Sequence, residues 1–175
     1  MRADDELVER ANRGDAEAFE ALYHRYRDWV YRLAWRFTGN QADALDVVQE
    51  TFTYLLKKFP GFRLTASMTT FLYPVVRHAS LNVRRRRSGG QADEPLLTGI
   101  PDPTTPATPR AELAAALAAL PHDQREVVLM RFVDDMSLNE IAEALSVPTG
   151  TVKSRLHRAL ETLRTDPRTR EYFLG

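Results

Sequence analysis

The sequence predicts an all-α protein of two small helical domains joined by a flexible linker. Apolar residues recur at spacings of three and four along both ends of the chain, which is the pattern of one face of an α-helix. The alternation of apolar and polar residues that is typical of β-strands is missing from the sequence. Between the helical stretches, residues 88–109 hold five prolines and three glycines and offer little that a core could bury. A length of 175 residues suits two domains of this size.

Two long helices are predicted first. The earlier one ends at Gly39 and Asn40, residues that tolerate a left-handed turn. Its apolar stripe consists of Phe19, Leu22, Tyr26, Val30, Leu33 and Phe37. The second helix closes at Pro60 and Gly61. We expect its buried stripe to consist of Leu45, Val48, Phe52, Leu55 and Phe59.

A third helix is expected over about residues 69–87, and it ends in four consecutive arginines. Its apolar positions are Phe71, Leu72, Val75, Val76, Ala79 and Val83. Proline inside a helix removes a backbone donor and costs about 3 kcal/mol. We therefore expect a bend or a late helix start at Pro74.

The second domain begins with an Ala- and Leu-rich helix over Glu112–Leu120 that Pro121 interrupts. Asp123 is expected to cap the next helix, Gln124–Phe132. Ser137 stands three residues before Glu140, which is the spacing of a capping box and opens a short helix that ends at Leu145. After a tight break at residues 146–150, the last helix turns an apolar stripe inward. The stripe consists of Val152, Leu156, Ala159, Leu160 and Leu163.

The last two helices and their turn form a helix-turn-helix pattern, in which the second helix normally enters the major groove of DNA. Opposite the inward stripe, the last helix displays Lys153, Ser154, His157, Arg158 and Glu161. Side chains rich in donors contact base edges and phosphates, and Arg155 at the edge of this face suits a phosphate. A basic helix face is often only a solvated surface. The preceding capped helix and the turn are what favour DNA binding here.

Composition excludes several classes of protein. Lysine plus arginine and aspartate plus glutamate both number 24, and cysteine is absent, which excludes disulfide scaffolds and thiolate zinc sites. No apolar run approaches the roughly 20 residues of a membrane span, and the acidic N-terminus does not resemble a signal peptide. We expect a soluble, cytoplasmic protein with no membrane insertion.

An enzyme is not expected. The four histidines share no metal-ligand spacing, and the sequence has no glycine-rich phosphate loop or nucleophile elbow. We therefore predict no catalytic residues, no metal site and no cofactor.

Two groups of motifs stand in order along the chain. The first group is Asp15–Phe19, Asp46–Phe52 (DVVQETF) and Asn82–Arg85, and the second is Arg125–Phe132 (REVVLMRF), Ser137–Leu145 (SLNEIAEAL) and Gly150–Ala159 (GTVKSRLHRA). They resemble regions 2 and 4 of the sigma-70 family of transcription initiation factors, respectively. The resemblance covers nearly the whole chain. Two helical domains and a proline-rich connector are the layout of the family's extracytoplasmic-function (ECF) group.

The resemblance implies that the second helix docks on the β′ clamp helices of core RNA polymerase. The residues it assigns to polymerase binding are Asp46, Gln49, Glu50 and Thr53. These share the face that we expect opposite Leu45 and Phe52, and its acidic character suits a basic partner. The resemblance further implies contact with the β flap, and it makes an anti-sigma factor a candidate partner.

The resemblance also implies that the third helix, with the loop at residues 61–68, reads and melts the minus-10 promoter element. The residues it assigns to minus-10 DNA are Arg77, His78, Asn82, Arg84, Arg85, Arg86 and Arg87. His78 stands where similar proteins commonly carry asparagine. Three aromatic residues, Phe62, Phe71 and Tyr73, are candidate platforms for unstacked bases, although core packing is the role that we expect for them, above all for Phe71.

For the minus-35 element, the resemblance implies major-groove contact by the last helix. The residues assigned there are Thr151, Lys153, Ser154, Arg155, His157 and Arg158. A helix-turn-helix regulator that acts without polymerase is the alternative, and it would leave the Asp46–Phe52 motif without a role.

The expected organisation follows from these assignments. Residues 1–87 form sigma region 2, residues 88–110 an acidic linker and residues 111–165 sigma region 4, followed by a tail at 166–175. The linker is expected to thread polymerase toward the RNA exit path. No apolar stripe extends into the tail, so its deletion is expected to matter little.

Overall fold

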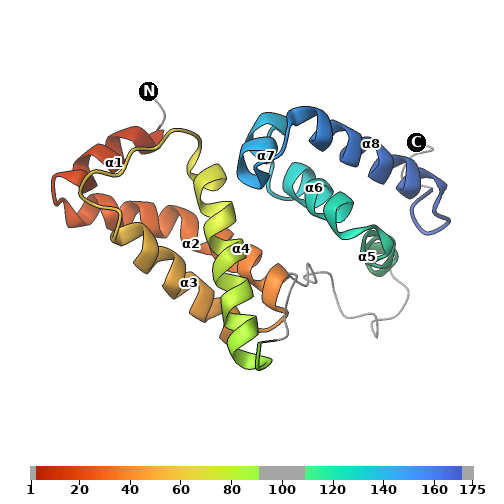
Figure 1. Ribbon diagram of the computed structural model, residues 1–175, viewed down its shortest axis with the longest axis horizontal. Coiled ribbons are helices and arrows are strands. Elements are labelled where there is room, and N and C mark those ends of the chain that lie inside the picture. The colour runs from red at the N-terminus through yellow and green to blue at the C-terminus, as the bar shows by residue number, and fades with distance from the viewer. Residues whose placement is uncertain (1–2, 91–108, 171–175) are drawn as a thin grey trace. The chain divides into compact units, whose positions relative to one another are not determined.

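The described part of the chain is entirely helical. The structure is a computed structural model that describes residues 3–90 and 109–170, and these form eight helices and their connecting turns (Figure 1). The chain divides into two compact units, Met1–Leu96 and Leu97–Gly175. We call their described parts domain 1 and domain 2. The predicted all-α class with two helical domains is confirmed, and none of the described helices is long and apolar enough to cross a membrane.

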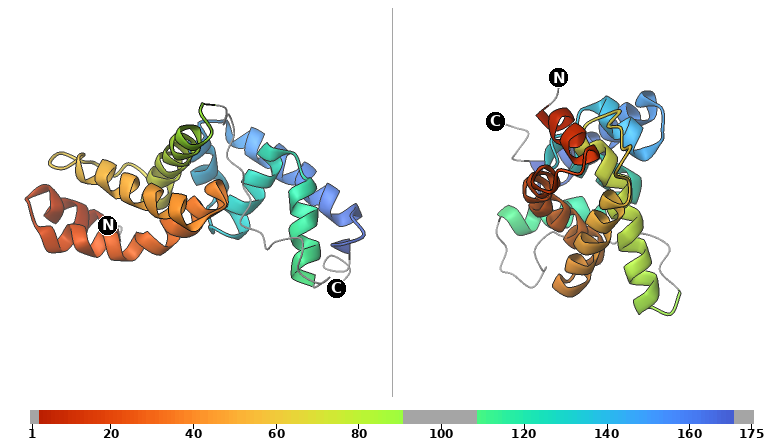
Figure 2. Two further views of the ribbon diagram at one scale, coloured as in Figure 1. Left: turned by 90° about the horizontal axis from the view of Figure 1, so that it is seen from below. Right: turned by 90° about the vertical axis from the view of Figure 1, so that its left-hand side faces the viewer.

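Domain 1 is a bundle of four helices. They are α1 (Ala3–Asn12), α2 (Ala16–Thr38), α3 (Gln41–Leu56) and α4 (Met68–Arg87). In Figures 1 and 2, α1 lies along α2, and α4 packs against both α2 and α3. The largest fully buried side chains of this core are Leu22, Leu33, Phe37, Leu55, Met68, Leu72 and Tyr73. The predicted stripe of α2 is therefore largely the core of the domain.

Local caps set the helix ends in domain 1. Asp15 accepts hydrogen bonds from the backbone N–H groups of Glu17 and Ala18 at the start of α2. Gly39 ends the same helix at φ 76°, and its N–H donates to the carbonyl of Trp35. Asn40 then accepts from the backbone N–H of Asp43 to begin α3. The predicted break at Gly39 and Asn40 is confirmed.

The buried face of α3 differs from the predicted one. Leu45 is 52% exposed, and Leu56, at the end of the helix, is 54% exposed. Phe52 and Leu55 of the predicted stripe are buried as expected, but the inward face also includes the smaller residues Ala44, Val47 and Thr51 in place of Leu45. Both sets recur at spacings of three and four, so the sequence holds two overlapping stripes. Packing of α3 against both α2 and α4 selects the one with the smaller side chains.

Helix α4 runs through its proline. Ser67 caps it by accepting from the N–H of Thr70, and the helix continues without interruption from Met68 to Arg87. The late start that we considered at Pro74 is therefore wrong, while the bend stays a prediction. The side chain of Pro74 is exposed, so its ring lies in solvent and not in the core.

Domain 2 also contains four helices. They are α5 (Pro109–Ala119), α6 (His122–Phe132), α7 (Leu138–Leu145) and α8 (Thr149–Thr165). Helix α8 contacts both α6 and α7. A cluster of Ala116, Leu120, Val128, Ala159 and Leu163 forms a core, and Leu117 and Leu156 pack against it. The predicted inward stripe of α8 is confirmed.

The caps of domain 2 bear out one prediction and correct another. Ser137 and Glu140 form the capping box, with Ser137 N–H donating to Glu140 Oε2 at 2.9 Å. Asp123 does not cap α6, because Pro121 occupies the N-cap position and no side chain bonds there. Asp123 lies in the first turn of α6 and pairs with Arg155 of α8 at 3.0 Å. The pattern of residues around Asp123 does not indicate this partner, because Arg155 lies on another helix.

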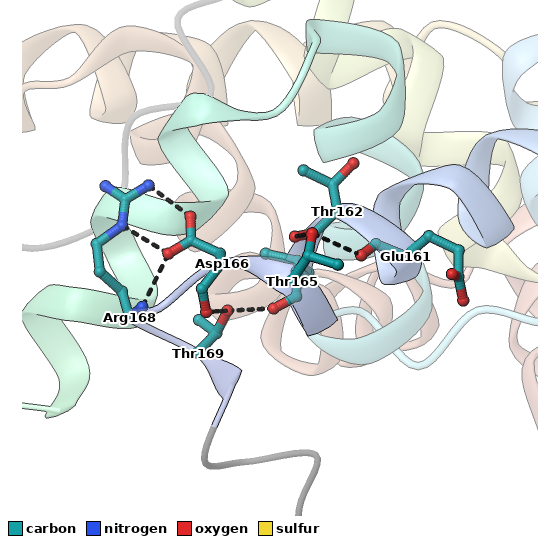
Figure 3. A network of polar contacts seen from close by, with 7 residues as sticks. Glu161, Thr162, Thr165, Asp166, Arg168 and Thr169 are labelled. Atoms are coloured by element: carbon teal, nitrogen blue, oxygen red, sulfur yellow. Dashed lines mark hydrogen bonds and ion pairs between the residues drawn. The ribbon is translucent and has the colours of Figure 1, made fainter.

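A folded turn follows α8. Asp166 accepts hydrogen bonds from the backbone N–H and the guanidinium of Arg168 (Figure 3). The Arg168 side chain and its backbone N–H lower the pKa of the Asp166 carboxyl to about 2. The ionised Asp166 carboxylate, paired with Arg168, therefore stabilises the folded state at neutral pH. That stabilisation is lost only as the pH falls from about 4 towards 2. Thr169 is fully buried, and its hydroxyl donates to the carbonyl of Leu163 at 2.5 Å. Thr169 therefore enters the interior although no apolar stripe extends there, and the small effect of deleting residues 166–175 stays a prediction.

Replacing Pro74 should stabilise domain 1. Pro74→Ala restores a backbone N–H that can donate to the Thr70 carbonyl, so we expect the free energy of unfolding to rise by up to about 3 kcal/mol. Urea unfolding measures this change. The matched variant Pro74→Gly restores the same donor but should gain about 1 kcal/mol less. An unchanged or lower stability for the alanine variant would contradict the prediction.

Removing the Thr169 hydroxyl should destabilise domain 2. Thr169→Val leaves the Leu163 carbonyl without this donor, and we expect a loss of about 1 kcal/mol in unfolding free energy. Thr169→Ser keeps the hydroxyl and serves as the control. Thermal unfolding of the two variants should place the midpoint of the valine variant below that of the serine variant. Equal midpoints would show that the bond contributes nothing.

Candidate functional site

Helix α8 presents a polar face that its packing holds in place. Val152, Ala159 and Leu163 are buried on the inner side of the helix. On the opposite side, the residues exposed to solvent are Lys153, Ser154, His157, Arg158 and Glu161. Because the inner stripe fixes the rotation of the helix, these five side chains keep a constant outward direction. The arrangement offers several hydrogen-bond donors on one rigid surface.

The first turn of α8 is joined to α7 by a side-chain hydrogen bond, while the start of the helix has no side-chain cap. Thr149 donates to the side-chain oxygen of Asn139 in α7, which joins the two helices of the motif. Pro148 stands at the N-cap, and no side chain caps the helix start. Thr151 is half-buried beside this open end. Uncapped N–H groups at a helix N-terminus favour an anion such as a phosphate.

Arg155 occupies a different position from its neighbours on α8. Its side chain is half-buried, and Nε lies 3.0 Å from Asp123 Oδ2 of α6. The sequence placed Arg155 at the edge of the DNA-facing surface, ready for a phosphate. The structure shows a cation that already has a carboxylate partner within the domain.

A second basic surface lies on α4. Arg77, Asn82 and Arg84 are half-buried, whereas His78, Arg85, Arg86 and Arg87 are exposed. Four consecutive residues point in different directions around a helix, so the arginine run surrounds the last turn instead of lining one face.

Two of these arginines contact α3. Arg86 forms an ion pair with Glu50, and Arg87 Nη1 lies 2.8 Å from Asp43 Oδ2. Asp43 also accepts a hydrogen bond from the side chain of Asn40 at 2.7 Å. The end of α4 is thereby tied to the start and the middle of α3. These pairs join residues at least 36 positions apart, and the sequence analysis did not find them.

The outward face of α3 combines polar and apolar side chains. Asp46, Gln49 and Thr53 are exposed there, and Glu50 is partly exposed at the border with α4. Leu45 and Leu56 are exposed on the same face. Their spacing from Gln49 could have revealed this, since positions 45, 49 and 56 lie close together around a helix. The predicted inward position of Leu45 is therefore wrong, and the face expected to be polar and acidic also carries leucine side chains.

The aromatic candidates lie mostly inside domain 1. Phe62 and Tyr73 are buried, and Phe71 is half-buried against Phe62, with ring centroids 4.8 Å apart. Phe71 also stacks on Tyr54, which is exposed. Lys58 Nζ lies 4.6 Å from the centre of the Tyr54 ring. The expected core packing is therefore confirmed for Phe62 and Tyr73, and Phe71 packs against Phe62 at the edge of the core.

The described residues, 3–90 and 109–170, contain no group of three or more histidine, cysteine or acidic side chains that could hold a metal ion. The surfaces just described consist of cations, amides, hydroxyls and carboxylates. Such groups bind and orient polar partners.

Comparison with known proteins gives consistent matches along the chain. Residues 22–89 match the family model for sigma-70 region 2, and residues 110–163 match that for sigma-70, region 4. The chain is 31% identical over 177 residues to the RNA polymerase sigma-H factor of Pseudomonas aeruginosa, and this match covers 91% of each chain. It is 28% identical over 173 residues to the ECF RNA polymerase sigma factor SigW of Bacillus subtilis, covering 90% of this chain and 92% of that one.

Solved structures show a similar fold. The structure of CnrH in complex with the cytosolic domain of CnrY matches with a TM-score of 0.68 at 24% identity, over 92% of this chain and 94% of that one. The sigma factor RpoE in complex with the anti-sigma factor NepR, from Bartonella quintana, matches with a TM-score of 0.63 at 22% identity. That match covers 85% of this chain and 96% of the other.

Proposed function

The chain belongs to the ECF group of the sigma-70 family, and from that premise we propose how its two domains divide the work of a sigma factor. As an RNA polymerase sigma factor, it binds core polymerase, recognises promoter DNA and initiates transcription. Sigma factors are initiation factors and not enzymes. We propose that this chain makes and breaks no bond itself and that polymerase carries out the chemistry.

Domain 2 is proposed to read the minus-35 element with α8. The supporting observation is the exposed row of donors opposite a buried stripe, which gives a major-groove helix a fixed orientation. The residues assigned to this element are Thr151, Lys153, Ser154, Arg155, His157 and Arg158. We place Thr151 and the open end of α8 near a phosphate. Arg155 would reach DNA only by sharing or leaving Asp123.

Domain 1 is proposed to hold the melted minus-10 strand with α4 and the loop before it. The residues assigned there are Arg77, His78, Asn82, Arg84, Arg85, Arg86 and Arg87. Cations attract the strand through its phosphates, and exposed aromatic rings can stack on unpaired bases. Because Phe62 and Tyr73 are buried, we give them a supporting role beneath this surface.

Polymerase docking is proposed for the outward face of α3. Asp46, Gln49, Glu50 and Thr53 supply carboxylates and hydrogen-bonding groups that suit basic clamp helices of the β′ subunit. Leu45 and Leu56 add an apolar contact beside them. Interfaces of this kind combine a desolvated apolar centre with a polar rim. For domain 2 we propose contact with the β flap, supported by the exposed apolar pair Phe132 and Val133.

An anti-sigma partner and a cellular location are also proposed. In the two solved structures named above, CnrH is in complex with the cytosolic domain of CnrY, and the sigma factor RpoE is in complex with the anti-sigma factor NepR. We propose that an anti-sigma factor binds this chain as well and holds it inactive. Since its polymerase and promoter partners are found there, we propose a cytoplasmic location. The proposed path of the linker toward the RNA exit lies mostly outside the described residues.

The observation that carries this proposal is the combination of two surfaces in one chain, a DNA-facing helix in domain 2 and an outward α3 in domain 1. Run-off transcription with purified core polymerase and a randomised promoter library tests it. We expect defined start sites only when chain and core are both present. A helix-turn-helix regulator would instead bind duplex DNA alone and give no transcripts.

Charge reversal on α3 should weaken core binding. With Asp46→Lys and Glu50→Lys together, we expect a loss of about tenfold or more in affinity for core polymerase, because two carboxylates at the proposed interface become cations. Fluorescence titration of the labelled chain with core measures this. The control Glu6→Lys with Glu9→Lys makes the same charge change on α1, where both residues are exposed. An equal effect of the two pairs would remove the assignment.

Truncation on α8 should weaken minus-35 recognition. Replacing Lys153 and Arg158 by alanine should cost about 1–3 kcal/mol for each bidentate base contact that is lost. The measurement compares holoenzyme affinity for a promoter with its own minus-35 element and for one with that element scrambled. We expect the variant to lose affinity for the first and to change little on the second. Full transcription from a minus-35-dependent promoter would count against the assignment.

A further inference from the structure

We propose that Glu50 serves two partners in turn, Arg86 in the free chain and core polymerase in the holoenzyme, so that docking releases Arg86 for promoter DNA. The inference rests on the proposed function, since it takes the outward face of α3 as the polymerase site. It adds a physical link between polymerase binding and DNA binding within domain 1.

The geometry places Glu50 between the two surfaces. It lies on α3, between the exposed residues Asp46 and Thr53 and the side that packs on α4, and its side chain is 37% exposed. Arg86 reaches it from the last turn of α4, with a side chain that is 62% exposed. One carboxylate thus borders both the proposed polymerase face and the arginine run.

A contact of this kind is easily exchanged. Exposed ion pairs contribute little, on the order of a twofold to fivefold factor in an equilibrium, because water and salt compete for both charges. A basic polymerase surface that desolvates Glu50 can therefore take it from Arg86. Arg86 would then regain an uncompensated charge close to where the melted strand is proposed to bind, and phosphate would be its next partner.

The neighbouring ion pair, between Arg87 and Asp43, is less easily exchanged. Asp43 has a side chain that is only 11% exposed, and it accepts both from Arg87 at 2.8 Å and from Asn40 at 2.7 Å. It lies three residues before Asp46, and its carboxylate is buried towards α4. Polymerase docking on Asp46 and Gln49 leaves this carboxylate covered. Arg87 therefore stays anchored and holds the end of α4 while Arg86 is released.

Linkage makes the effect reciprocal. If docking of Glu50 frees Arg86 for DNA, then capture of Arg86 by DNA frees Glu50 for docking by the same factor. The free chain would bind the minus-10 strand with part of its arginine run neutralised. Assembly on core would remove that neutralisation without any rearrangement of the helices.

The test measures core affinity in the absence of DNA. We expect Arg86→Gln to tighten binding of the full-length chain to core polymerase about twofold to fivefold, because Glu50 no longer has to leave a partner. Removing a cation could also reduce repulsion from a basic surface. Arg87→Gln removes the same charge from the adjacent position, so its smaller gain sets that non-specific contribution.

A double-mutant cycle isolates the pair. In a Glu50→Gln background, the excess gain from Arg86→Gln over Arg87→Gln should vanish, while in an Asp46→Asn background it should persist. Asp46 is the matched control because it is an exposed carboxylate one turn earlier on the same face. Thermal unfolding of every variant confirms that domain 1 stays folded.

The outcomes are distinct. Equal gains from the two arginine variants, or a gain that persists without the Glu50 carboxylate, would overturn the inference. Weaker core binding by Arg86→Gln would do the same, since it would mean that Arg86 itself contacts polymerase. Failure of the unaltered chain to bind core at all would instead overturn the proposed function.

Discussion

The packing of α3 between α2 and α4 is the constraint on which domain 1 depends. Ala44 and Val47 are completely buried on its inner side, and Phe52 and Leu55 are buried further along the helix, so its rotation is fixed. That rotation places Leu45 and Gln49 outward, and it turns the carboxylates of Asp43 and Glu50 towards the end of α4. A rotation of α3 by one residue would bury Leu45 and move the carboxylates away from the arginines. The docking face and the charge pairs therefore have one common cause.

In domain 2, the rotation of α8 is fixed by contacts along its inner side and at both of its ends. Its recognition helix is fixed by Val152 and Ala159 on the inside, by Thr149 on Asn139 at its start, and by the turn around Thr169 at its end. Between these points Lys153, Ser154, His157 and Arg158 are exposed on the outer face. Residues such as Lys153 and His157 can be selected for the DNA they contact without a cost in stability. This separation of duties suits a helix that must read different promoters on one scaffold.

Features set by neighbouring residues were predictable from the sequence, and features set by distant ones were not. The break at Gly39 and Asn40 and the capping box of Ser137 depend on backbone groups within a few residues, and both are confirmed. The buried side of α3 depends on which of two stripes fits its neighbours, and the size of Leu45 was misleading. The partner of Asp123 lies on another helix, and Thr169 is buried by a turn that no periodicity announces. The donors of α8 were found because one stripe there excludes every other rotation.

Equal numbers of acidic and basic residues have a physical consequence for a protein of this family. A chain with a large uniform positive charge would bind DNA everywhere, because non-specific affinity grows with each phosphate that is neutralised. Pairing arginines with carboxylates on α3 keeps the cations in place while reducing the field they present to DNA. Glu50 is itself part of the proposed docking face. Arg86 would therefore be freed for DNA only where core polymerase is bound. Local charge pairing can in this way confine strong DNA binding to the assembled complex, which sequence totals alone would not suggest.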